Sequence, residues 1–402
     1  MIKKITIDQL KPGMYVADLN NQWVPKSNAS RSGIIKYQST IDKVRALGVQ
    51  EIYIDTDKGV DCPDGIPVDA VKQLQAEQFD SISVQSGTRA SVRTSVEAER
   101  ERAHKLYGQT KNLIGGILED IKQGKSVDAE AVDNSAADLV SSLDANENAL
   151  ACLSYIRSKD EYLLEHSINV GLLMGIFARS KRMDNDLTRQ LVAGGLLHDI
   201  GKILVPDEIL NKPGKLTPEE WEEMKRHVSY GEQILDVTPG LTDVTRSICA
   251  LHHERLDGSG YPRNLPEEQI TLPGRMSAIC DVYDAVTADR VYHVGMAPNE
   301  ALKKLIEWSI FHLDKDLVYD FIRCLSVYPV GTLVELSNGR AGVIVEANRR
   351  QPKLPLVRVF FNTRHQHQVE AHLVNLADAK VEIEIINTLD ARALGIDIRP
   401  FM

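Results

Sequence analysis

The feature that most constrains this chain is a series of histidines and aspartates set into helical segments between residues 165 and 284. Its centre is the sequence GLLHDIGK, residues 195–202, where His198 and Asp199 follow an apolar run. Imidazole and carboxylate side chains hold iron, manganese and zinc in proteins, so seven of them in one region predict a metal site. The seven are His166, His198, Asp199, His227, His252, His253 and Asp281.

The alternative is a structural role for these side chains, because a lone histidine on an apolar helix is usually a hydrogen-bonded core residue. Here, however, His166, His198 and His227 lie at or beside the apolar faces of three different helical segments, and a histidine pair ends a fourth. Burying five imidazoles and two carboxylates in a helical core costs free energy unless they are paired or bind a metal. The pattern therefore favours a metal centre.

Asp199 is the residue best suited to join two metals, because each of its carboxylate oxygens can contact one cation. Two metals about 3.5–4 Å apart are the known arrangement for in-line displacement at phosphorus. Two divalent ions carry four positive charges, and Asp199, Asp281 and one hydroxide together carry three negative charges. The centre therefore has a net charge of one positive unit. That charge matches the single negative charge of a phosphodiester.

Composition places limits on the class of protein. The chain has 402 residues, enough for two or three domains, and its 43% hydrophobic and 26% charged residues are ordinary for a globular protein. A net charge of −10 argues against broad binding of a nucleic acid polymer. Five scattered cysteines favour a reducing compartment. No apolar run reaches about 18 residues and no signal peptide is evident, so we expect a cytoplasmic protein without a membrane span.

The first part of the chain divides into three predicted regions. Residues 1–62 alternate like strands around one helix and predict a small α+β domain, either regulatory or a plain appendage. Residues 63–95 are rich in Ser, Gln, Asp and Gly, which is typical of a flexible linker. Residues 96–147 predict two amphipathic helices, the second capped by Asp128. They can couple domains, form a homodimer face, or belong to the following bundle.

The remaining chain is predicted to be a helical core followed by a sheet. Residues 148–328 are helical almost throughout, and Thr217 and Glu220 form a capping box around Pro218. Residues 329–402 alternate with period two and predict a small antiparallel β region. The expected fold class is thus mostly α, with a helical bundle between a small α+β domain and a small β region.

Two motifs in the core resemble a known family. The sequence HDIGK is similar to the signature of the HD phosphohydrolase superfamily, and HHERLDGSGYP, residues 252–262, extends the resemblance to the HD-GYP family. Members of that family are bacterial phosphodiesterases that act on cyclic di-GMP. Residues 1–60 also resemble the small N-terminal domain that often precedes HD-GYP modules. The resemblance implies that the core is an HD-type helical bundle.

The resemblance also implies a role for each matched residue. Asp199 would be catalytic as a ligand shared by two metals, with a bridging hydroxide between the metals as nucleophile, and Lys202 would be catalytic by facing the scissile phosphate. Glu254 and Asp257 would shape the loop rather than bind metal. One metal would be held by His166, His198, Asp199 and Asp281, and the other by Asp199, His227, His252 and His253. The substrate contacts would be Lys202, Gly260, Tyr261, Pro262 and Arg290, and Asp284 would support a metal ligand from behind.

The implied activity is hydrolysis of cyclic di-GMP to pGpG, with further cleavage to GMP left open. Mixed histidine and carboxylate ligands favour two ions of iron or manganese. Diguanylate cyclase-type signalling proteins are the partner proteins that the resemblance suggests. One alternative is a non-catalytic cyclic di-GMP receptor that signals through partner proteins. Another is a different HD enzyme, such as a nucleotide phosphohydrolase, although such a site needs neither the paired histidines nor the GYP loop.

Two positions depart from the family pattern. Tyr162 stands where some members carry a carboxylate that binds a third metal, and Glu161 is one place too early for that role. We therefore expect two metals rather than three. His293 stands where a lysine or arginine is frequent, three residues after Arg290. Because of this change, we expect one contact between the protein and a phosphate of the substrate to be weaker.

Overall fold

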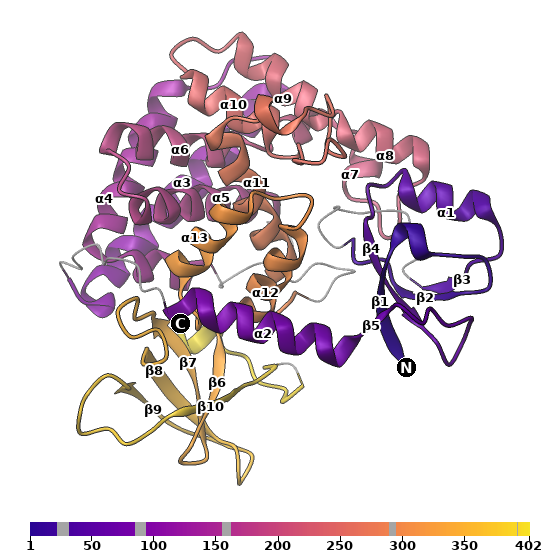
Figure 1. Cartoon of the computed structure of the whole chain (residues 1–402). Coiled ribbons are helices and arrows are strands. Elements are labelled where there is room, and N and C mark those ends of the chain that lie inside the picture. The colour runs from indigo at the N-terminus through magenta and orange to yellow at the C-terminus, as the bar shows by residue number, and fades with distance from the viewer. Residues whose placement is uncertain (22–31, 85–93, 155–161, 289–294, 392) are drawn as a thin grey trace.

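A computed structural model describes the chain except for residues 22–31, 85–93, 155–161, 289–294 and 392. An N-terminal sheet, a large helical core and a C-terminal sheet follow one another along the chain (Figure 1). The fold class is therefore the expected one, mostly α with two small sheets. No helix in the described ranges is both long and apolar enough to cross a bilayer.

The N-terminal sheet has five short strands in the order β3-β2-β4-β1-β5, and its paired strands run antiparallel. Helix α1 (Gln38–Arg45) covers the sheet and buries Ile41 and Val44, which are three residues apart and share one helix face. The strands are β1 (Ile2–Thr6), β2 (Tyr15–Asp18), β3 (Gly33–Ile34), β4 (Glu51–Asp55) and β5 (Ile66–Pro67).

Helix α2 (Val68–Val84) lies where the composition predicts a flexible linker, so that prediction is wrong for these residues. Val71, Phe79 and Ile82 recur at helical spacing and are buried, Phe79 and Ile82 within the apolar cluster of the core, and α2 packs against α12 (Pro298–Trp308) and α13 (Lys315–Leu325). Most of the polar residues between them are exposed, and they give the segment its linker-like composition. Tertiary packing of three apolar side chains overrides that composition.

Helices α3 (Val96–Lys122) and α4 (Ala129–Leu153) begin at the side-chain caps Ser95 and Asp128. Asp128 thus caps its helix as the sequence predicts, since its carboxylate accepts from the backbone N–H of Ala131. Both helices pack against the core helices α5 and α6, directly or through one another. They form one layer of the helical core, which is one of the three roles open to them from sequence.

The core helices surround one continuous apolar cluster. Helices α5 and α6 cross closely, because a Cβ on Gly195 would lie only 2.6 Å from the Cα of Gly171. This close approach brings the start of α5 near the end of α6. The remaining core elements are α5 (Tyr162–Ser180), α6 (Asn185–Leu197), η2 (Ile200–Leu204), α7 (Asp207–Leu210), α8 (Pro218–Lys225), α9 (His227–Asp236), α10 (Asp243–Leu251), η3 (Glu267–Gln269) and α11 (Leu272–Thr287).

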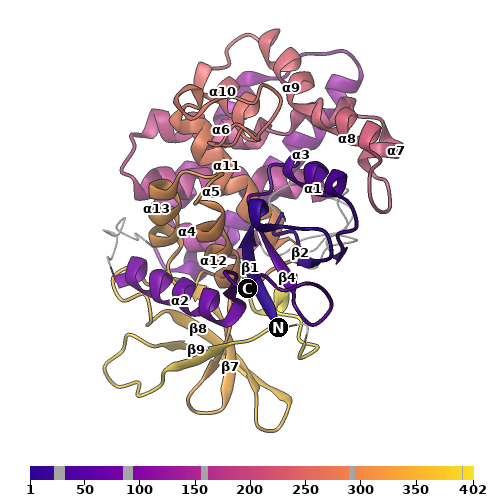
Figure 2. The same ribbon diagram turned by 45° about the vertical axis from the view of Figure 1, so that its right-hand side comes forward.

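The C-terminal sheet is antiparallel throughout, in the order β10-β6-β7-β8-β9. Phe360 and Val343 belong to the apolar cluster of the helical core, so one face of the sheet packs on the helices. Figure 2 places this sheet at the end of the molecule opposite α9 and α10. Its elements are β6 (Leu333–Leu336), β7 (Arg340–Glu346), β8 (Leu356–Asn362), β9 (His367–Asn375), β10 (Ile385–Thr388) and the short helix η4 (Arg399–Phe401).

Candidate metal centre

The histidines and aspartates of the sequence motifs converge on one buried point in the helical core. They come from the N-terminal part of α5, the end of α6, the start of α9, the end of α10 and the middle of α11. Each of their side chains is at most 5% exposed. The structure brings together His166, His198, Asp199, His227, His252, His253 and Asp281.

Three of the histidines are oriented by the backbone that directly precedes them. Each donates its Nδ1–H to a backbone carbonyl three residues earlier, since a carbonyl oxygen can only accept. That hydrogen bond keeps the proton on Nδ1, so Nε2 is unprotonated and its lone pair points into the cluster. The donor and acceptor pairs are His198 to Gly195 at 2.7 Å, His227 to Met224 at 2.6 Å and His252 to Cys249 at 2.8 Å.

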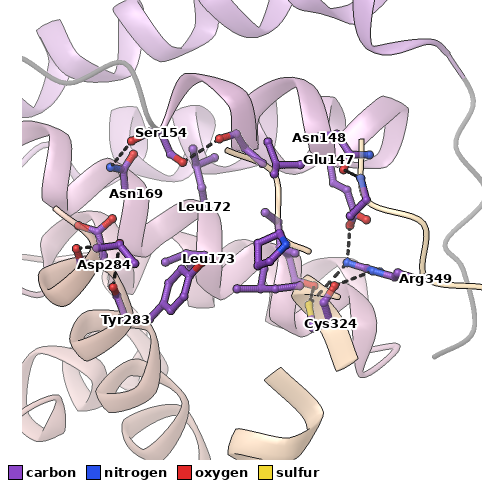
Figure 3. A pocket seen from close by; sticks show the side chains of 17 residues that line it. Glu147, Asn148, Ser154, Asn169, Leu172, Leu173, Tyr283, Asp284, Cys324 and Arg349 are labelled. Atoms are coloured by element: carbon purple, nitrogen blue, oxygen red, sulfur yellow. Dashed lines mark hydrogen bonds and ion pairs between the residues drawn. The ribbon is translucent and has the colours of Figure 1, made fainter. Parts of the chain in front are cut away.

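His166 obtains the same orientation from a carboxylate on another helix. Its Nδ1 lies 2.7 Å from Asp284 Oδ2, so Nε2 again faces the cluster. Asp284 also lines a cavity of about 50 Å³ between α4, α5, α11 and the C-terminal sheet. Figure 3 shows Asp284 and Tyr283 at one end of this cavity and Arg349 at the other.

Asp199 lies at the centre of the cluster and divides it into two groups. Its Oδ2 is 3.5 Å from His166 Nε2 and 3.4 Å from His198 Nε2. Its Oδ1 is 3.4 Å from His227 Nε2 and 3.7 Å from His252 Nε2. The candidate ligand atoms within each group, with His253 in the second, lie within 4.8 Å of one another. The two oxygens of one carboxylate therefore face two separate sets of imidazoles.

Asp281 contacts both groups. Its Oδ1 is 3.1 Å from His166 Nε2 and 3.9 Å from His198 Nε2. Its Oδ2 is 3.6 Å from Nδ1 of His253, the one histidine of the cluster that turns this nitrogen inward. The family resemblance assigns Asp281 to the first group, and its shortest contact, the one to His166, agrees with that group.

Electrostatics keep His227, His252 and Asp199 in the protonation states that metals require, whereas at His166 burial is outweighed by the bonds to Asp281 and Asp284, which raise its pKa. Burial lowers the pKa of His227 to about 4 and the pKa of His252 to about 3, so both imidazoles are neutral at pH 7. Burial alone would raise the pKa of Asp199, but the charges of Lys202 and His198 lower it well below its usual range. Neutral imidazoles and ionised carboxylates are the forms that bind metal.

The cluster is not satisfied by its own hydrogen bonds. Among the residues that the structure describes, six buried ligand atoms of the cluster have no hydrogen-bond partner. Leaving this many buried polar atoms unpaired costs about 1–3 kcal/mol each, whereas divalent cations would satisfy all six at once. The donor set of imidazole nitrogens and carboxylate oxygens thus fits divalent first-row metals. The atoms are His198 Nε2, Asp199 Oδ1, His227 Nε2, His252 Nε2, His253 Nδ1 and Asp281 Oδ2.

The loop that follows α10 is fixed over this cluster by Glu254. Its two oxygens accept from the backbone N–H groups of Arg263, at 2.8 Å, and Leu265, at 3.0 Å. The ring of Tyr261 consequently lies over His253, with their centroids 4.5 Å apart, and meets Trp221 of α8 edge-on at 5.9 Å. Glu254 shapes the loop, in agreement with its predicted role.

Comparison with known proteins agrees with this geometry. Residues 151–317 match the HD domain family, and residues 2–132 match a domain of unknown function, DUF3391. A cyclic di-GMP phosphodiesterase of Pseudomonas aeruginosa is 35% identical over 394 residues, which is 98% of this chain and 93% of that protein. The chain belongs to the HD-GYP family. With its HD domain and buried histidine–aspartate cluster, this HD-GYP protein is a divalent-metal-dependent hydrolase.

Two further relatives match the HD-GYP core. A cyclic di-GMP phosphodiesterase of Thermotoga maritima is 40% identical over 159 residues, 39% of this chain and 43% of that protein. A protein of Vibrio cholerae named 3'3'-cGAMP-specific phosphodiesterase 2 is 43% identical over 123 residues, 30% of this chain and 24% of that protein. The names of these relatives include two different cyclic dinucleotides.

Some predicted substrate contacts of the HD-GYP core lie beside the cluster, and others cannot be placed. Lys202 pairs with Asp199, and Gly260, Tyr261 and Pro262 form the loop beside His253. Arg290, His293 and Glu161 lie outside the described residues, and Tyr162 is placed only as the first residue of α5.

Sequence reasoning missed the groups that orient the HD-GYP ligands. The groups at Gly195, Met224 and Cys249 are backbone carbonyls, which every residue has, so the residue types there do not indicate the role. Only their position three residues before a histidine could have revealed them. A histidine at the end of a helix can donate to the carbonyl three residues earlier, and His198 and His252 are both helix C-caps. Trp221 was also missed, because an aromatic residue on a short helix is usually part of the core.

Proposed function

We propose that this protein hydrolyses cyclic di-GMP to pGpG at a centre of two divalent metals. The proposal rests on the two groups of ligand atoms that face the two oxygens of Asp199. It also rests on identity along nearly the whole chain to a protein named as a cyclic di-GMP phosphodiesterase. Partner binding by cyclases, a homodimer and cleavage beyond pGpG stay predictions.

The metals would be held by the ligand sets that meet at Asp199. His166, His198 and Asp281 would complete the first set, and His227, His252 and His253 the second. Mixed imidazole and carboxylate ligands favour iron or manganese over magnesium. When bound, such ions would supply Lewis-acid polarisation of the phosphate and water activated at neutral pH.

The protein's own residues would position the substrate and manage charge. The reaction adds water to phosphorus, breaks the bond from phosphorus to the 3′ oxygen, and passes a proton to that oxygen. Lys202 reaches from the buried Asp199 toward solvent, its side chain 18% exposed, where its ammonium would stabilise the developing charge or assist the leaving oxygen. Tyr261, held over His253, would contact the nucleoside.

The deciding experiment is anaerobic reconstitution with Fe²⁺ or Mn²⁺, followed by chromatography of the products of cyclic di-GMP. We expect pGpG to accumulate, and 3'3'-cGAMP in a parallel reaction tests which dinucleotide is preferred. Calorimetric binding of cyclic di-GMP without turnover would contradict the proposal and favour a receptor. Faster turnover of 3'3'-cGAMP than of cyclic di-GMP would show that 3'3'-cGAMP is the preferred substrate, and the proposed hydrolysis of a phosphodiester would still hold.

Metal content provides a second test. Elemental analysis of the reconstituted protein is expected to give two metals per chain, because the ligand atoms form two groups that share Asp199. His227→Ala is expected to lower the content toward one, since His227 lies only in the second group. Three metals per wild-type chain would show that a further ligand compensates for Tyr162.

Asp284→Asn tests the orientation of His166. The amide keeps the size of the side chain but loses the charge that fixes the Nδ1–H of His166. We expect metal affinity to fall by about 10–100-fold, the usual effect of removing a group that supports a metal ligand. Asn169→Ala is a control, because Asn169 lines the same cavity without contacting His166 in the contacts described. Unchanged affinity in Asp284→Asn would contradict the role.

A further inference from the structure

The N-terminal sheet is joined to the helical core through one buried carboxylate. Glu307 lies near the end of α12, and its side chain is 1% exposed. Its Oε1 accepts from Asn20 Nδ2 at 2.8 Å and from the Tyr53 hydroxyl at 2.8 Å, and Lys4 Nζ is 3.4 Å away. Three residues of the N-terminal unit, the sheet and α1 within residues 2–67, thus meet on one oxygen of the core.

The second oxygen of Glu307 completes this junction. It accepts from Gln75 of α2 at 3.2 Å and from Lys304 of its own helix at 2.9 Å. Asn20 in turn accepts from Trp308 Nε1 at 3.3 Å. A buried carboxylate with this many donors fixes the docking geometry, because separating the units would leave a charge and several donors unpaired. Both views place α12 beside the N-terminal sheet (Figures 1 and 2).

The segment that directly follows α12 contacts the loop over the metal centre. His312 is 5% exposed, and its Nδ1 lies 3.1 Å from Asp257 Oδ2. Its carbonyl accepts from the backbone N–H of Leu256 at 3.1 Å. The N-terminal unit also reaches the same loop, because Gln50, which precedes β4, donates to Asp257 Oδ2 at 3.4 Å. Asp257 therefore receives contacts from both sides of the junction.

Asp257 determines the course of the loop toward Tyr261. Its Oδ1 accepts from the backbone N–H of Ser259 at 3.1 Å and from the Ser259 hydroxyl at 2.7 Å. Burial opposes ionisation of Asp257, but bonds from His312 and Ser259 lower its pKa to about 2, so it is a charged acceptor. Tyr261 then donates its backbone N–H to the carbonyl of His253 at 3.1 Å.

We propose that the N-terminal unit, docked on Glu307, holds the GYP loop in its substrate-binding conformation, with Asp257 and His312 as positioning residues. The inference rests on the proposed function, since it assigns the loop to substrate binding. It gives the N-terminal unit, which lies within the residues matched to a domain of unknown function, a role in forming the substrate site. The unit acts through α12 and through Gln50 rather than by contributing a catalytic group.

Glu307→Gln tests this directly, because the amide keeps the size but removes the charge that Lys4 and Lys304 neutralise. We expect KM for cyclic di-GMP to rise about tenfold with kcat and metal content close to wild type. Amide hydrogen exchange in residues 256–262 is expected to become faster. Glu300→Gln is the matched control on α12, because Glu300 is exposed and pairs with Lys303 at the surface. It should change neither quantity.

Tyr53→Phe is a milder second variant, which removes one hydroxyl donor to Glu307 and keeps the ring. It should give the same two changes at smaller size, and it serves if Glu307→Gln does not fold. A wild-type exchange rate in residues 256–262, or an unchanged KM, in the folded variants would overturn the proposal. If the wild-type protein does not hydrolyse cyclic di-GMP, the exchange measurement still decides whether the N-terminal unit holds the loop.

Discussion

Replacing Asp199 with alanine is expected to abolish hydrolysis of cyclic di-GMP, with kcat lower by at least about 10³-fold. The reason is that Asp199 lies at the centre of the cluster, where each of its oxygens faces two imidazoles of a different group. Without it the two sets share no ligand, and Lys202 loses its carboxylate partner. Turnover is measured by chromatography of pGpG after anaerobic metal loading.

Asp199→Asn separates the charge of this side chain from its shape. The amide has nearly the same size but only one oxygen, so we expect one of the two metals to be lost and turnover to fall almost as far. Asp186→Asn is the control, because Asp186 is an exposed acid in the first turn of α6 and pairs with Arg189. Full metal content with wild-type turnover in Asp199→Asn would contradict the bridging role.

The architecture follows from sequence wherever local signals agree with tertiary packing. The caps Asp128 and Thr217 start helices where the sequence places them, because a side-chain acceptor at a helix start acts within one turn. For residues 68–84 the local signals disagree with the packing, and the predicted linker is wrong. Their composition is polar, and the segment is helical because Val71, Phe79 and Ile82 are buried and α2 packs against two helices distant in the sequence.

The candidate site could be predicted as far as its side chains carry chemistry. Histidines and aspartates that can bind metal are recognisable in a sequence, and separate helices bring them together. What the sequence could not give is the orientation of each ring, which depends on backbone carbonyls and on Asp284. Nor could it reveal the junction at Glu307, because a lone acid on an amphipathic helix is usually a solvated residue.

Gly201→Ala is expected to lower both the thermal stability and the metal content of the protein. Gly201 lies in η2 between Asp199 and Lys202, and η2 packs tightly on α9. A Cβ there would overlap the carbonyl oxygen of His227 and the amide nitrogen of Gly231, both backbone atoms. Forcing such contacts costs about 1–3 kcal/mol or more, and relief requires η2 and α9 to move apart.

That movement would act on the metal centre itself, because Asp199 directly precedes η2, His227 begins α9, and Asp199 Oδ1 lies 3.4 Å from His227 Nε2. We therefore expect a lower Tm, fewer than two metals per chain and a large fall in kcat, measured by thermal unfolding, elemental analysis and product formation. Gly116→Ala on α3 is the matched control, since no neighbouring atom lies within 4 Å of its Cβ position. Alanine there is expected to stabilise the helix by about 0.5–1 kcal/mol. A Gly201→Ala protein with wild-type Tm and metal content would show that η2 and α9 can separate without disturbing the ligands.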